Sequence, residues 1–81
     1  MRIKDLNDKL NEFIKTHHLE KKYEKAKTFF ENDFNHPSLN VEILEPKHLK
    51  IYSFRIDIKY RAIFIIVNDE VEVITITNHY Q

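Results

Sequence analysis

The sequence predicts an α+β domain in which an N-terminal helical hairpin packs on one face of a four-stranded, mainly antiparallel sheet. Apolar residues recur at helical spacing up to residue 33, and beyond residue 40 they alternate with polar residues or run unbroken. The connections between these segments are short, which favours neighbouring helices and antiparallel strands in sequence order. Because each helix has one apolar stripe and each outer strand one apolar face, covering one sheet face with the helices is the economical arrangement.

Length and composition limit both the domain organisation and the function. The 81 residues are enough for one domain, residues 1–81, and include neither cysteine nor glycine. The composition therefore excludes a thiolate metal site and a glycine-rich phosphate loop. The 13 basic and 13 acidic side chains balance, so only a local basic patch would support nucleic-acid binding. No apolar run reaches membrane length and no secretory segment opens the chain, so we expect a cytoplasmic protein.

Two helices are predicted first, over residues 5–15 and 19–33, separated by the short break Thr16-His17-His18. Pro37 ends the helical region, because the residue before a proline avoids the α conformation. The histidines near these helices lack the spacing of a metal-ligand pair, and we predict no metal or cofactor. The aromatic side chains of the second helical region are expected in the core, namely Tyr23, Phe29, Phe30 and Phe34.

Four strands follow in the prediction. A short strand spans residues 41–43, and the second spans residues 52–59, where apolar and polar side chains alternate. Residues 62–67 lack polar partners, which predicts a central strand covered on both faces. The turn Asn68-Asp69-Glu70 leads into the last strand, residues 71–76. The side chains expected to be buried are Leu10, Phe54, Ile56 and Phe64, while Arg55 is expected on the sheet face opposite the helices.

Several short segments of the chain resemble the RelE/ParE superfamily of bacterial toxins from type II toxin–antitoxin pairs. They are Tyr52-Ser-Phe-Arg-Ile56, Tyr60-Arg-Ala-Ile63, the acidic turn and strand that follow, Asn78-His79-Tyr80, and Asn35-His-Pro-Ser-Leu39. The resemblance covers residues 19 to 81, and the His-Tyr ending is most similar to the YoeB branch. It implies a first strand before the helices, for which only Met1-Arg-Ile-Lys4 is present, so we expect that strand to be short or missing.

The resemblance also implies a function. The YoeB and RelE branches cleave messenger RNA on the ribosome without a metal, and a cognate antitoxin protein neutralises them. Two alternatives stay open: a ParE-like protein that inhibits DNA gyrase without catalysis, and an inactivated toxin retained as a binding module. The balanced charge favours the alternatives, because ribosome-acting members are usually basic, whereas His79 favours the nuclease.

Four residues are the catalytic candidates under the nuclease interpretation. Arg61 matches the family arginine that binds the phosphate, and a permanently charged guanidinium suits that role. Arg55 lies on the predicted wet face of its strand, beside Ser53 and Asp57. His79 has an ordinary pKa near neutrality and suits proton transfer, while Tyr80 suits hydrogen bonding or base stacking. The structural alternatives are ion pairs, to an Asp or Glu for Arg61 and to Asp57 or Glu72 for Arg55, and a solvated tail for His79 and Tyr80.

The loop before the second strand supplies candidates for binding RNA. Lys47, His48 and Lys50 can attract an RNA backbone, with Tyr52 beside them, although an ordinary solvated loop has the same composition. The YoeB resemblance also involves a glutamate near this loop. Glu45 lies there, but its spacing does not align, so we assign it no role.

Overall fold

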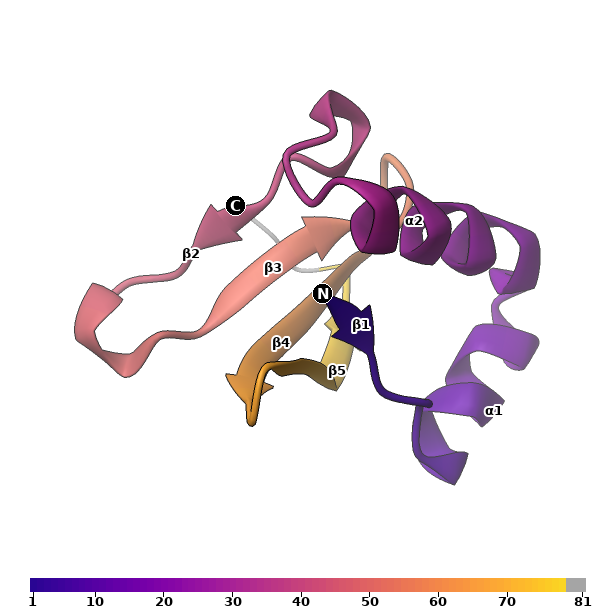
Figure 1. Ribbon diagram of the computed structural model, residues 1–81. Helices are drawn as coiled ribbons and strands as arrows, with labels where there is room; N and C mark the ends of the chain where they lie inside the picture. The colour runs from indigo at the N-terminus through magenta and orange to yellow at the C-terminus, as the bar shows by residue number, and fades with distance from the viewer. Residues whose placement is uncertain (79–81) are drawn as a thin grey trace.

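The computed structural model describes residues 1–78 as an α+β domain with two helices and a mixed, five-stranded sheet (Figure 1). The elements are β1 (Arg2–Ile3), α1 (Asp8–Thr16), α2 (Glu20–Asn32), β2 (Glu42–Ile43), β3 (Tyr52–Arg55), β4 (Arg61–Val67) and β5 (Glu70–Thr77), with 3-10 turns at Pro37–Leu39 and Lys47–Leu49. The strands lie in the order β1-β5-β4-β3-β2, so the predicted third strand, β4, is central as expected.

The two helices form where the apolar spacing predicts them. α1 begins later than expected because Asn7 caps it: the Asn7 side chain accepts a hydrogen bond from the Leu10 backbone N–H at 2.8 Å. His18, between the helices, takes a positive φ of 56° and so turns the chain. α2 lies across the sheet (Figure 1), and its Phe30 ring contacts Phe64 of the central strand with ring centroids 5.4 Å apart.

The sheet has one strand more than the sequence predicts. Residues Arg2 and Ile3 form β1, which pairs in parallel with Glu70 and Val71 of β5 and makes the sheet mixed. A strand this short carries no periodic pattern, so only the tertiary pairing reveals it. The Ile3 backbone N–H also donates a 2.8 Å hydrogen bond to the Glu31 side chain, which ties β1 to the end of α2.

Two predictions about the long strands were wrong. β3 ends at Arg55 and not at residue 59, because the chain turns through residues 56–59, where Ile58 is 99% exposed. β4 is not covered on both faces either: Ile66 is 44% and Val67 40% exposed. The helices cover only one face of the sheet, and they do not reach the end of β4.

The core lies between the helices and the sheet. The buried positions Leu10, Phe54, Ile56 and Phe64 are confirmed, whereas Phe34 is 48% exposed because α2 ends before it. No helix within residues 1–78 is long and apolar enough to cross a membrane. The buried apolar residues are Ile3, Leu10, Ile14, Leu19, Tyr23, Ala26, Phe30, Leu39, Phe54, Ile56, Tyr60, Ala62, Phe64, Val71, Val73 and Ile76.

Candidate functional site

Arg55 and Arg61 lie directly opposite each other on neighbouring strands. Arg55 is the last residue of β3, Arg61 the first of β4, and the two are Cα partners in the antiparallel register. Cross-strand partners share a sheet face, so both arginines lie on the face opposite to the one that holds Phe54 and Ala62. Like charges placed in this way repel each other, and a bound anion would relieve the repulsion.

Arg61 is held from two sides and is only 3% exposed. Its Nε and Nη2 donate to the Ser53 hydroxyl at 3.0 and 2.9 Å, and Nη2 also donates to the Asn40 carbonyl at 2.5 Å. These bonds connect β4 to β3 and to the segment before β2, so Arg61 helps to hold the sheet together. Within residues 1–78, the hydrogen-bond partners of Arg61 are the Ser53 hydroxyl and backbone carbonyls.

The charges around Arg61 act on its pKa in opposite directions. Burial lowers the pKa of Arg61 below the ordinary arginine value, the carboxylate of Glu42 acts to raise it, and the neighbouring Arg55 lowers it further. A guanidinium nevertheless stays protonated in proteins. The site therefore holds a fixed positive charge in partly desolvated surroundings, where a charge interacts more strongly than in water.

A hollow of about 350 Å³ opens beside the two arginines. Three cationic side chains border it, those of Arg55, Lys59 and Arg61, together with one carboxylate, Asp57. Neither Arg55 nor Lys59 forms an ion pair within residues 1–78. The two carboxylates considered as partners for Arg55 are paired with lysines instead, Asp57 with Lys22 and Glu72 with Lys4. The ion pair predicted as the alternative for Arg55 is thus not formed. The remaining lining residues are Ile58 and Asn78.

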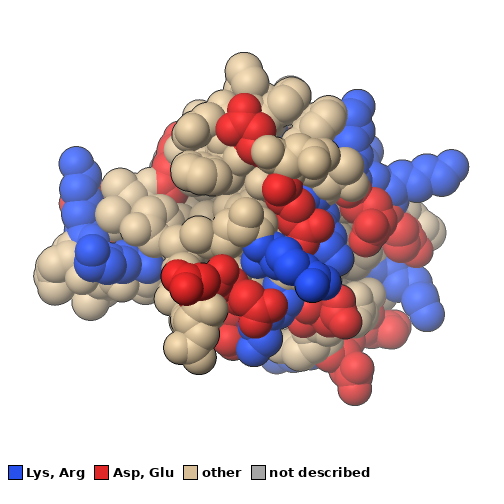
Figure 2. Space-filling model, in the orientation of Figure 1, with Lys and Arg blue, Asp and Glu red and all other residues tan. Residues whose placement is uncertain are grey.

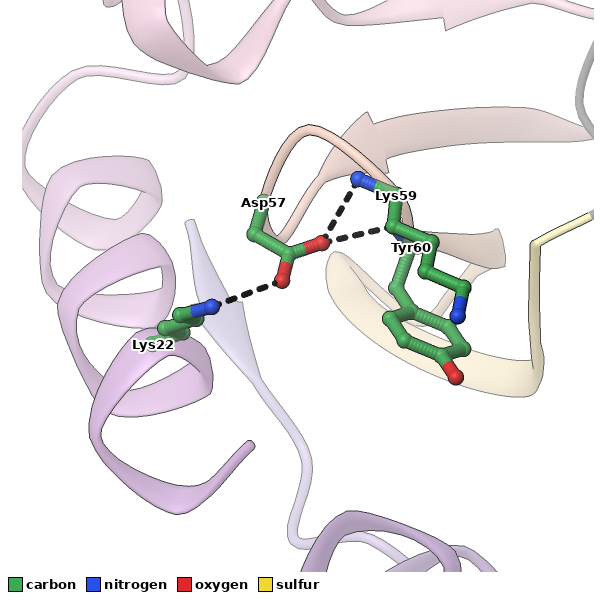
Figure 3. Close-up of polar contacts among 4 residues, drawn as sticks. All are labelled: Lys22, Asp57, Lys59 and Tyr60. Atoms are coloured by element: carbon green, nitrogen blue, oxygen red, sulfur yellow. Dashed lines mark hydrogen bonds and ion pairs between the residues drawn. The ribbon is translucent and has the colours of Figure 1, made fainter. Parts of the chain in front are cut away.

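Asp57 builds the turn that separates the two arginines along the chain (Figure 3). One carboxylate oxygen accepts hydrogen bonds from the backbone N–H groups of Lys59 and Tyr60 at 2.9 and 2.7 Å, and the other meets the Lys22 ammonium at 3.0 Å. Partial burial acts to raise the pKa of Asp57, but these hydrogen bonds outweigh it and the pKa is lowered overall. Asp57 therefore fixes the hairpin with its charge already compensated.

The predicted RNA-binding residues are not part of this site. Lys47 and His48 are in the 3-10 turn before β3, and Lys50 follows it, whereas Arg55 is at the other end of β3. Tyr52 is on the helix-facing side, where its ring stacks on Phe64 with centroids 5.4 Å apart. Lys50, the nearest of the three loop residues along the chain, is separated from Arg55 by roughly 16 Å of extended chain at about 3.3 Å per residue. His79 and Tyr80, the other two catalytic candidates, lie outside the described residues.

Glu42 is the one acidic residue near Arg61 that the sequence analysis did not select. It pairs with Ser53 across β2 and β3, which places it on the face of the arginines, and its carboxylate accepts a 3.2 Å hydrogen bond from the Asn40 side chain. The signal was available in the sequence, because Glu42 alternates with Val41 and Ile43 and so points away from their face. Among residues 1–78, no group of three or more His, Cys, Asp or Glu could hold a metal.

Comparison with known proteins does not assign the chain. No protein-family model matches it, and no curated protein matches it significantly.

Proposed function

We propose that this protein is the toxin of a type II toxin–antitoxin system, a cytoplasmic, metal-independent and ribosome-dependent mRNA endonuclease similar to the RelE/ParE superfamily. The observation that carries the proposal is the cross-strand pair Arg55–Arg61 beside an open hollow. Paired guanidinium groups bind phosphate through several charge-assisted hydrogen bonds. The short β1 lies before the helices, where the resemblance implies a first strand, and this position supports the proposal.

The proposed chemistry assigns separate roles to the two arginines, to Glu42 and to the two remaining catalytic candidates. Glu42 accepts the proton of the 2′-hydroxyl, whose oxygen attacks the adjacent phosphorus as the bond to the 5′-oxygen breaks. Arg61 and Arg55 stabilise the charge that develops on the phosphorane. His79 returns a proton to the departing 5′-oxygen, and Tyr80 hydrogen-bonds or stacks on a base. The products are a 2′,3′-cyclic phosphate and a 5′-hydroxyl, so the reaction consumes no water, and the guanidinium groups supply the charge stabilisation that a metal would otherwise provide.

An apolar groove supports neutralisation by an antitoxin. Its volume is about 190 Å³, and it lies where the helices leave the sheet uncovered. Tyr52 of this groove follows the β2–β3 connection, which carries the exposed Lys47 and Lys50, and at that end of the molecule Figure 2 shows basic side chains next to uncharged surface. The occupant we propose is an amphipathic antitoxin segment with acidic residues on its flank. The groove is lined by Met1, Phe30, Phe34, Tyr52, Phe64 and Ile66.

One observation favours the gyrase alternative. The Nε and Nη2 atoms of Arg61 are engaged by Ser53 and Asn40, and the residue is only 3% exposed, which is typical of a structural arginine. A ParE-like gyrase inhibitor needs no catalytic arginine. The balanced net charge of the chain agrees with that alternative as well.

Induced expression in a bacterial host distinguishes these functions. The nuclease proposal predicts growth arrest, with new 5′ ends in a translated reporter mRNA by primer extension, and no new ends when the start codon of the reporter is removed. Growth arrest with intact transcripts and altered plasmid supercoiling would support the gyrase alternative. Normal growth with neither effect would support an inactivated toxin and contradict both active proposals.

A further inference from the structure

A second hollow lies on the α2 side of Arg55. Its volume is about 290 Å³, and it shares Arg55 and Asp57 with the hollow beside Arg61. At this position β3 has no neighbour on the β2 side, because β2 pairs only with Tyr52 and Ser53. Arg55 therefore borders both hollows. The other lining residues are Lys22, Lys25, Ala26, Phe29, Ser38, Leu39 and Ile56.

The charge of this second hollow is positive. Its one carboxylate, Asp57, is already neutralised by Lys22 and by two backbone N–H groups (Figure 3). Lys25 and Arg55 form no ion pair within residues 1–78. Both side chains are exposed and available to an anionic ligand.

The base of the second hollow is apolar. Ala26, Leu39 and Ile56 are buried residues that border it, and Phe29 forms one side. The Lys25 ammonium lies 5.8 Å from the centre of the Phe29 ring, which is stacked on its other partner, His36, with centroids 4.0 Å apart. Cationic groups above apolar and aromatic surface are the usual elements of a site for single-stranded nucleic acid.

We propose that the second hollow binds the nucleotide next to the one whose phosphate is held between Arg55 and Arg61. Lys25 and Arg55 contact its phosphate, and the apolar base accommodates its ribose and base. The ligand is single-stranded RNA, since successive phosphates can then occupy the two hollows on either side of Arg55. This inference rests on the proposed function, because it extends the same RNA path from the sheet onto α2.

The salt dependence of RNA binding tests this subsite. The probe is a short, fluorescein-labelled 2′-O-methyl oligonucleotide, which binds as RNA does but lacks the attacking hydroxyl. Each phosphate contact on a single strand contributes about 0.7 to the slope of log Kobs against log salt. Lys25→Ala should weaken binding and reduce that slope by about 0.7. Lys9→Ala is the control, because Lys9 is an exposed lysine of α1 that does not border the hollow.

Three outcomes distinguish the subsite from the function. A reduced slope for Lys25→Ala with an unchanged slope for Lys9→Ala supports the subsite. An unchanged slope for Lys25→Ala, with weaker binding by Arg55→Ala, overturns the subsite and leaves the proposed function intact. Absence of binding by the wild-type protein also overturns the subsite alone, because cleavage of a translated mRNA tests the function separately.

Discussion

Replacing Ser53 with alanine tests whether the buried Arg61 network stabilises the fold. Ser53 is fully buried, and its hydroxyl accepts hydrogen bonds from Nε and Nη2 of Arg61 at 3.0 and 2.9 Å. The substitution removes both bonds at once and leaves two donor groups of a buried cation without this acceptor. Hydrogen bonds to charged groups each contribute about 1.5–3 kcal/mol. Because the Asn40 carbonyl still accepts from Nη2, only the Nε bond is lost without a replacement, and we expect Ser53→Ala to lower the free energy of unfolding by about 2–3 kcal/mol.

Urea denaturation followed by circular dichroism measures this effect. With an m value near 1 kcal/mol per M, at the low end for small domains, the midpoint should fall by about 2–3 M. Ser38→Ala is the control, because Ser38 is exposed and surface substitutions usually change stability by less than about 0.5 kcal/mol. If Ser53→Ala changed the midpoint no more than Ser38→Ala does, the network would not contribute to stability.

Three further predictions concern the core, the hairpin and the partner. Phe64→Ala should cost about 3–5 kcal/mol, because the ring is 2% exposed and packs against other aromatic rings; a loss below 1 kcal/mol in the same urea assay would contradict this. The folded-state pKa of Asp57 is lowered, so the unfolded state binds more protons and stability falls as the pH drops below about 4; Asp57→Asn should remove that part of the acid dependence in pH-dependent thermal melts. Phe34→Glu should weaken binding of the proposed antitoxin at least about tenfold in calorimetry, because the partly exposed ring borders the apolar groove, and equal affinity would exclude that groove.

The fold class could be predicted from the sequence because its signals are local. The helical stripes and the alternation in residues 52–55 repeat over enough residues to show their period. The alternation beyond Arg55 misled the prediction, because Asp57 uses its carboxylate to close a turn instead of continuing the strand. Phe34 misled it as well, since an aromatic residue after the end of a helix can border a surface groove as well as a core.

The candidate site depended on contacts that no local pattern contains. Arg55 and Arg61 face each other because the chain turns back between them, directly after Arg55. The sequence analysis instead continued the strand to residue 59 and so placed the turn too far along the chain. The contact of Arg61 with Asn40 joins residues 21 positions apart, and it brings Glu42 to the site. The two-residue β1 was likewise visible only through its partner on β5.

Cleavage of mRNA on a programmed ribosome by purified protein tests the proposed function most directly. Arg55→Ala is the informative variant, because Arg55 is exposed and its loss should leave the fold intact. Its companion Arg61→Lys keeps the charge but loses the forked geometry. We predict that the wild-type protein cleaves, that Arg55→Ala lowers the single-turnover rate by about 10²–10³ as for other lost transition-state donors, and that Arg61→Lys retains partial activity. Intact mRNA with the folded wild-type protein, or an Arg55→Ala rate equal to that of the wild type, would contradict the proposal.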